Sequence, residues 1–108
     1  MVFNRYSLTD LAVTDLDTAF SYICEELKNP SAAMEFSKRI EEAISTICLF
    51  PNSGVLLEND LTKSSEVRKF VVDRYLIYYL FDCNAKIVHI LRIVFARRNQ
   101  SEIIHAID

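Results

Sequence analysis

The chain has 108 residues, of which 51% are hydrophobic and 25% charged, and this balance indicates a single globular domain spanning residues 1–108. Its single glycine excludes a glycine-rich phosphate-binding loop, and no apolar run is long enough to cross a bilayer. The net charge of −3 hides an asymmetry, because residues 1–66 carry five basic and eleven acidic side chains whereas residues 67–108 carry seven basic and four acidic ones. The basic C-terminal part therefore indicates an anionic partner.

The N-terminal stretch and the cysteines bear on the cellular compartment and on cofactor binding. The N-terminal stretch MVFNRYSLTD lacks the charged and apolar regions of a signal peptide, so we expect a cytoplasmic protein that does not contact a membrane. Three cysteines, Cys24, Cys48 and Cys83, are odd in number and show no zinc-ligand spacing. We therefore expect reduced, structural cysteines, and neither a metal nor another cofactor.

The N-terminal third predicts a strand followed by an amphipathic helix. Residues 2–8 are aromatic and β-branched enough for a strand, and Thr9 or Asp10 can cap the helix that follows. Acidic residues, including Asp15, are assigned to the solvated side of this helix. The apolar positions that share one helical face are Ala12, Leu16, Ala19, Phe20, Ile23 and Leu27.

A second helix follows with clear start and stop signals. Asn29 is a suitable N-cap and Pro30 a natural first residue, whereas Pro51 ends the helix and Gly54 permits a turn. The short connection between the two helices predicts an antiparallel hairpin. The apolar face of this helix consists of Ala33, Phe36, Ile40, Ala43, Ile44 and Ile47.

The C-terminal half predicts a sheet. Residues 55–66 lack periodicity and indicate a loop, and the segments 67–72, 75–81 and 86–96 are rich in Val, Ile, Phe and Tyr with hairpin-length separators. We expect an α+β fold in which the N-terminal strand and helix hairpin pack on a mainly antiparallel sheet of about four strands, with a short C-terminal helix. Alternation along the last strand places Leu91 and Ile93 on one face and Arg92 on the other. The sheet face away from the helices remains apolar, so it needs a second cover, for which a partner segment is one candidate.

Basic and aromatic residues are the groups that could carry chemistry. Arginine forks bind phosphates, tyrosines stack on bases, and arginines stabilise the charge that develops during RNA cleavage. The alternative is that the tyrosines belong to the core and the arginines are solvated strand ends. His89 lies inside an apolar strand and is expected to be a packing residue, whereas His105 is expected to be more exposed. The sheet candidates are Arg68, Lys69, Arg92, Arg97 and Arg98, with Tyr75, Tyr78 and Tyr79 beside them.

Three blocks in this order resemble the RelE/ParE superfamily of type II toxin–antitoxin toxins over nearly the whole chain. The helix-hairpin block contains an NP-x-AA junction and an FP-x-x-G exit. VRKFVVDRYLIYYLF resembles the family's arginine-led strand, turn and Y-x-I-x-Y strand, and IVHILRIVFARRNQ resembles its closing strand. The resemblance implies a toxin that an antitoxin wraps and holds inactive, in a possible toxin–antitoxin hetero-oligomer.

The resemblance leaves the cellular target open between two subgroups. RelE-like members cleave mRNA in the ribosome, and a set of that kind would place catalytic roles on Arg98, Lys69 and His105. However, Leu76 stands where an arginine commonly follows the first strand tyrosine, and the position of the late tyrosine falls near Ile104. The sequences of the strands resemble ParE-like members, which poison DNA gyrase, more closely. A third alternative is an inactive relative that only binds partners. In the favoured ParE-like case, target or antitoxin contacts would fall on Arg68, Arg92, Arg97, Tyr75 and Tyr78.

Overall fold

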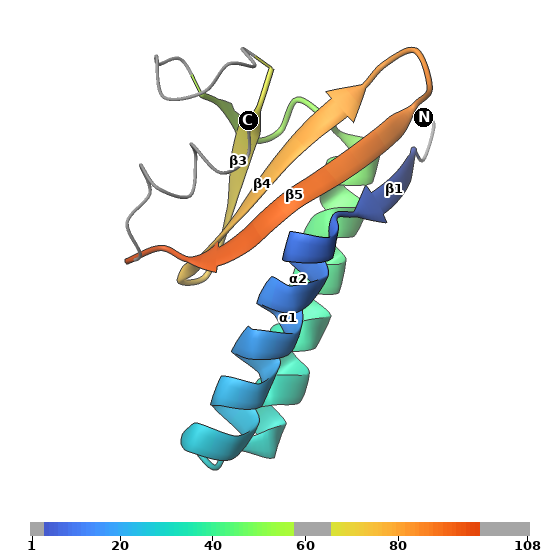
Figure 1. Cartoon of the computed structure of the whole chain (residues 1–108). Coiled ribbons are helices and arrows are strands. Elements are labelled where there is room, and N and C mark those ends of the chain that lie inside the picture. The colour runs from blue at the N-terminus through green and yellow to red at the C-terminus, as the bar shows by residue number, and fades with distance from the viewer. Residues whose placement is uncertain (1–3, 58–65, 98–108) are drawn as a thin grey trace.

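The computed structural model describes residues 4–57 and 66–97 and has an α+β architecture (Figure 1). Its elements are β1 (Arg5–Leu8), α1 (Asp10–Ser21), a π-helical turn η1 (Tyr22–Glu26), α2 (Pro30–Leu49), β2 (Val55–Leu56), β3 (Arg68–Val72), β4 (Tyr75–Asp82) and β5 (Ile87–Phe95). The strands form one sheet in the order β1-β5-β4-β3-β2, in which β1 runs parallel to β5 and the other pairs are antiparallel. Figure 1 shows the helix hairpin against one face of this sheet and reaching beyond its edge. Among the described residues, no helix combines the length and apolar character needed to cross a membrane.

The predicted fold class is confirmed, with one addition to the sheet. Residues 55–66 were expected to be a loop, but Val55 and Leu56 pair with Lys69 and Arg68 as the short edge strand β2. The described sheet therefore has five strands rather than about four. Two residues are too few to produce a periodic signal, which is why the pattern indicated a loop.

The first helix begins where predicted and ends differently. Thr9 is the N-cap, and its hydroxyl oxygen accepts a hydrogen bond from the Ala12 amide at 3.1 Å. In η1 the Leu27 amide donates to the Tyr22 carbonyl at 3.1 Å, which is a five-residue rather than a four-residue step. This widened turn shifts the phase of the helix, so Leu27 is 56% exposed and the prediction that it belongs to the core is wrong.

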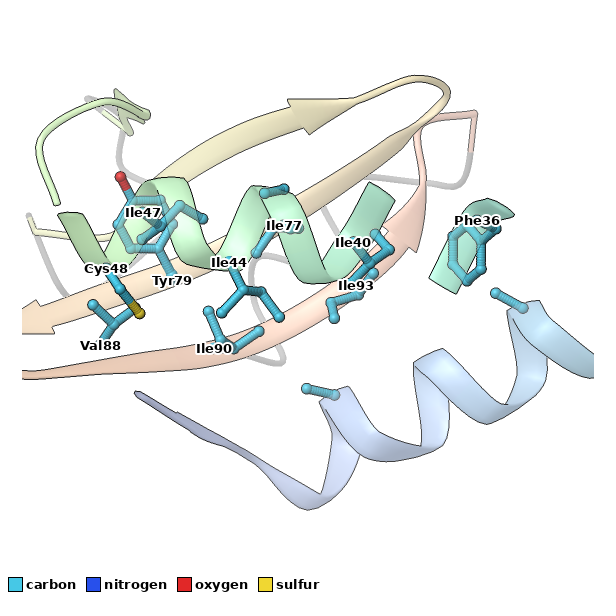
Figure 2. Packing of buried hydrophobic residues seen from close by; sticks show 13 residues of the cluster. Phe36, Ile40, Ile44, Ile47, Cys48, Ile77, Tyr79, Val88, Ile90 and Ile93 are labelled. Carbon is cyan, nitrogen blue, oxygen red and sulfur yellow. The ribbon is translucent and has the colours of Figure 1, made fainter. Parts of the chain in front are cut away.

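The second helix matches its prediction closely. Asn29 accepts a hydrogen bond from the Ala32 amide at 3.1 Å, and Pro30 occupies the first turn. All six residues predicted for its apolar face are buried, and Cys48 joins them. Figure 2 shows how this face packs on the sheet, with Cys48, Tyr79 and Val88 gathered at one end of the cluster and Phe36 at the other.

The opposite face of the sheet carries a second, smaller core. Its members are buried within the chain, so the apolar face has the second cover that was predicted, and a partner segment is not needed at these positions. Tyr78 is only 1% exposed in this cluster. The buried residues are Leu57, Val67, Leu76, Tyr78 and Val94, with Leu91 partly buried against them.

A β-bulge in β5 changes which side chains of this strand face the helices, compared with the predicted alternation. Tyr78 pairs with Arg92 and Tyr79 with Ile90, so Leu91 is an extra residue in β5. The bulge moves Ile93 to the helix side with Ile90, whereas Leu91 packs on the other side. The predicted grouping of Leu91 with Ile93 on one face is therefore wrong.

Candidate partner-binding surface

The bulged part of β5 is held by a buried ion pair with α1. The Arg92 Nε atom lies 2.8 Å from one carboxylate oxygen of Asp15, and Arg92 Nη2 lies 3.0 Å from the other. The two side chains are only 11% and 9% exposed, respectively. The hydrogen bonds to Asp15 raise the pKa of Arg92, against a smaller opposing effect of burial. Arg92 is therefore buried against Asp15, and its guanidinium is not that of a solvated strand end.

Asp15 also completes the hydrogen bonding of the sheet edge. β1 pairs with β5 only as far as Ile90, so within residues 4–57 and 66–97 the next part of β5 has no neighbouring strand on that side. There the Thr9 hydroxyl donates to the Leu91 carbonyl at 2.7 Å, and the Ile93 amide donates to Asp15 at 2.9 Å. The side chains of Thr9 and Asp15 thus hydrogen-bond to the β5 backbone at Leu91 and Ile93, beyond the point where β1 ends.

A groove of about 520 Å³ opens beyond this point, between the second half of α1 and the end of β5. We refer to it as the β5-edge groove. The Asp15–Arg92 pair forms part of its wall, and the rest is mainly apolar and aromatic. Tyr22 at its rim is 52% exposed and Leu11 is 49% exposed. The lining includes Leu11, Thr18, Tyr22, Tyr75, Ile93 and Phe95.

Arg68 has a structural role in a different part of the sheet. Its Nη1 donates to the Gly54 carbonyl at 2.9 Å and lies 3.5 Å from the Asn52 carbonyl. Next to it, the Tyr79 hydroxyl donates to the Pro51 carbonyl at 2.6 Å and accepts from the Gly54 amide at 2.9 Å. We call Pro51, Gly54, Arg68 and Tyr79 the Tyr79 network. It fixes the segment that follows α2 onto β3 and β4.

Gly54 is required in this network for space rather than for backbone freedom. A Cβ atom at this position would lie 2.7 Å from the Tyr79 hydroxyl oxygen and 2.8 Å from the Lys69 carbonyl oxygen. Its backbone has no positive φ angle. The sequence-based reason for this glycine, a turn conformation, is therefore replaced by close packing.

The two predicted contact tyrosines are packed differently from each other. Tyr75 stacks at a tilt on Phe36, with ring centroids 4.7 Å apart, and meets Phe95 edge-on at 5.6 Å, so it forms one wall of the groove. Tyr78 lies in the second core. Burial raises the pKa of both phenols, with a smaller contribution from Tyr22 at Tyr75, so both are neutral at pH 7. Buried in this way, Tyr78 cannot stack on a base.

The remaining predicted residues lie apart from one another or outside the described residues. Lys69 is half-buried in β3, opposite Tyr78 and two strands from Arg92. Arg97 is exposed just after β5, close to the β3–β4 turn, where the Ala96 amide donates to the Arg74 carbonyl at 2.8 Å. Arg98 and His105 fall outside the described residues, so their roles stay predictions.

Asp15 is the residue of this surface that the sequence pattern missed. It was assigned to the solvated side because it is acidic. Its position nevertheless falls three residues after Ala12 and four before Ala19, which are both fully or nearly fully buried. An acid in phase with an apolar helical stripe, in a chain with an arginine inside an apolar strand, is the signal that could have identified the pair.

Comparison with known proteins was informative at the level of the family. Residues 6–100 match the family model described as the ParE toxin of the type II toxin–antitoxin system parDE. The chain belongs to this family. A search of curated protein sequences found no match. The earlier resemblance to the RelE/ParE superfamily of type II toxins is thereby confirmed.

Solved structures share the fold of this ParE-family chain. One belongs to the chromosomal ParDE toxin–antitoxin system from P. aeruginosa, with a TM-score of 0.68, 20% identity, and coverage of 88% of this chain and 98% of that chain. Another belongs to the toxin–antitoxin complex RelBE2 from Mycobacterium tuberculosis, with a TM-score of 0.64, 20% identity, and coverage of 87% and 99%. At this identity the likeness establishes the architecture, which the two subgroups share.

Proposed function

We propose that this ParE-family toxin is held inactive by a cognate antitoxin and that, once released, it arrests growth by inhibiting DNA gyrase. The observation that carries the proposal is the match of residues 6–100 to the ParE toxin family. Both structural relatives come from toxin–antitoxin systems, which supports an antitoxin as the partner of this chain.

The placement of the described basic residues supports a contact mechanism over RNA cleavage. General acid–base cleavage needs groups that converge within hydrogen-bonding reach of one phosphate. Arg68 is engaged by loop carbonyls and Arg92 by Asp15. Lys69 lies two strands from Arg92, roughly 10 Å across the sheet, and Arg97 is a further five residues along, about 16 Å at strand rise. Within the described residues, these cations do not form one catalytic cluster.

The direct test is a supercoiling assay with purified gyrase and the antitoxin-free toxin. We expect dose-dependent loss of supercoiling, reversed by adding the antitoxin, and no effect on relaxation by a type I topoisomerase. Arg97→Ala should weaken the inhibition, because Arg97 is exposed and forms no ion pair with a described residue. Ser53→Ala, at another exposed position, serves as the control.

Two other outcomes would replace the proposal with the alternatives considered from the sequence. Full gyrase activity together with cleavage of ribosome-bound mRNA would make the chain a RelE-like endoribonuclease, in which Arg98, Lys69 and His105 would be the residues to mutate. Full gyrase activity and intact mRNA, with antitoxin binding retained, would leave an inactive relative that binds a partner.

A further inference from the structure

The turn between β3 and β4 and the end of β5 bring two exposed arginines together. Asp73 and Arg74 form this turn, and the Ala96 amide after β5 donates a hydrogen bond to the Arg74 carbonyl at 2.8 Å. Arg97 follows directly, so at strand dimensions its Cα atom lies roughly 6 Å from that of Arg74. Both side chains are exposed, and neither forms an ion pair with a described residue. We call Arg74 and Arg97 the arginine pair.

The acidic side chain beside Arg74 in the turn is engaged by a third arginine. Arg39 Nε on α2 lies 3.5 Å from one carboxylate oxygen of Asp73 and 3.3 Å from one of Glu35. Both carboxylates and Arg74 line one hollow of about 430 Å³ between α2 and the turn. Because Asp73 pairs with Arg39, it does not neutralise Arg74. The charge of the arginine pair is therefore available to another molecule.

The turn keeps this arrangement in a backbone conformation that glycine would adopt more easily. Asp73 has a φ angle of 54°, which lies in the left-handed region. Its carboxylate makes a contact with Arg39 that glycine could not make. Backbone strain of this kind is concentrated at functional positions. Together with the hydrogen bond between Ala96 and Arg74, the contact fixes the turn that presents Arg74.

The surroundings of the arginine pair favour a short acidic segment over a long polyanion. Tyr22 lines the hollow beside Arg74, and it also lines a shallow depression with Asp17, Glu25 and Glu26. A nucleic-acid strand lying across the pair would bring further phosphates toward these carboxylates, and the like charges would repel each other. Two planar guanidinium groups instead suit the carboxylates of a protein partner.

We propose that the arginine pair binds an acidic segment of gyrase, with Arg74 as a contact residue beside Arg97. The inference rests on the proposed gyrase inhibition and deepens it, because it names the chemistry of the contact. Arg39 is a positioning residue for this contact, since it holds the Asp73 carboxylate away from Arg74. Because the contact is formed by exposed charges, it weakens as the ionic strength rises.

The first test measures binding of the antitoxin-free toxin to purified gyrase without DNA. Arg74→Glu reverses a charge of the pair, and Lys38→Glu makes the same change in charge at an exposed position of α2. We expect Arg74→Glu to raise the Kd by at least about tenfold and Lys38→Glu by no more than about twofold, with a smaller difference at high salt. Thermal unfolding of both variants checks that the fold is retained. Equal Kd values for the two variants would overturn the proposal.

A second test asks whether the two arginines contact the same acidic segment. Arg74→Ala and Arg97→Ala are measured singly and together in the same binding assay. If both side chains bind one segment, the double variant should raise the Kd by clearly less than the product of the two single fold-changes. A double effect equal to that product would reject the pair as one site.

The role of Arg39 is tested by removal and rescue. Arg39→Ala frees the Asp73 carboxylate to pair with Arg74, so we expect the gyrase Kd to rise about threefold. Asp73→Asn in the same chain removes that carboxylate and should return the Kd close to the parent value. If Asp73→Asn had no effect in this background, Arg39 would not act by holding Asp73, and its positioning role would be refuted.

The outcomes separate this inference from the proposed function. A parent toxin that inhibits gyrase, together with an Arg74→Glu variant that inhibits it equally well, would reject the inference alone. Binding to DNA without gyrase, lost in Arg74→Glu, would assign the pair to phosphates and also overturn the inference. Failure of the parent toxin to bind or inhibit gyrase would instead count against the proposed function.

Discussion

The Tyr79 network and the β5-edge groove are two regions of one sheet that are built in contrasting ways. In the network, side chains bond to backbone groups, and the Tyr79 hydroxyl both donates and accepts at full burial. At the groove, a buried ion pair secures α1 to β5. One region is held by hydrogen bonds to backbone groups, whereas the other is held by a buried ion pair beside an open groove.

This contrast shows what the family motifs report. The FP-x-x-G exit, the arginine-led strand and the second tyrosine of Y-x-I-x-Y meet in the Tyr79 network, as Pro51, Gly54, Arg68 and Tyr79. These residues hold the architecture together. Motif residues also occur at the groove, where Tyr75, the first tyrosine of Y-x-I-x-Y, and Phe95 of the closing strand form part of the wall. Motif likeness therefore reports the architecture of both regions, and it does not by itself identify a partner.

Removing Asp15 should give the largest effect in either region. Asp15→Ala leaves the buried Arg92 charge and the Ile93 amide without an acceptor, so we expect a loss of about 3–5 kcal/mol in the free energy of unfolding. Urea unfolding at pH 7 measures it. The control Asp17→Ala removes an exposed acid two residues away and should cost no more than about 0.5 kcal/mol. Similar losses for both would mean that the ion pair does not secure this end of the sheet.

Adding one methyl group in the Tyr79 network should have the next largest effect. In Gly54→Ala the new Cβ meets the Tyr79 hydroxyl and the Lys69 carbonyl, so overpacking should cost about 1–3 kcal/mol. Ser53→Ala, at the exposed neighbouring position, is the control for urea unfolding. An unfolding free energy equal to that of the parent protein would show that the Tyr79 hydroxyl and the Lys69 carbonyl can shift to accommodate the added methyl group.

The two tyrosines of the Y-x-I-x-Y strand allow a direct comparison between the regions. Tyr79→Phe leaves the Gly54 amide and the Pro51 carbonyl without their partner and should cost about 1–2 kcal/mol. Tyr75→Phe keeps the ring contacts with Phe36 and Phe95 and loses no hydrogen bond that the structure shows, so its unfolding free energy should change by less than about 0.5 kcal/mol. A larger loss for Tyr75→Phe would reverse the assignment of structural roles.

Sequence reasoning predicted the parts of the fold that depend on local periodicity and capping. The Thr9 and Asn29 caps, the apolar face of α2 and the order of the strands followed from helical phase and hairpin-length separators. The β-bulge at Leu91 and the π-helical turn before Leu27 were not predicted. Each inserts one residue into a regular element, and this insertion leaves no signal in the local pattern of apolar residues. Those two shifts are why the predicted grouping of Leu91 with Ile93 was wrong and why Leu27 is exposed rather than part of the apolar helix face.

The candidate site was less predictable for a related reason. Asp15 and Arg92 are far apart in the sequence, and charge alone suggested that each was solvated. β1 ends at Leu8, so among the described residues the next part of β5 has no neighbouring strand, and the Ile93 amide bonds to the Asp15 carboxylate instead. The predicted contact residue Arg97 is exposed at the open end of the sheet, whereas Arg68 and Tyr78 are engaged in packing and hydrogen bonding.

The measurement that tests the gyrase account most directly is pulse labelling of cells just after this chain is induced without its antitoxin. Early incorporation of thymidine is compared with early incorporation of methionine, and a parallel culture that co-expresses the antitoxin serves as the control. The account predicts that thymidine incorporation falls first and that the antitoxin prevents the fall. A first fall in methionine incorporation would contradict it and would point to ribosome-dependent mRNA cleavage.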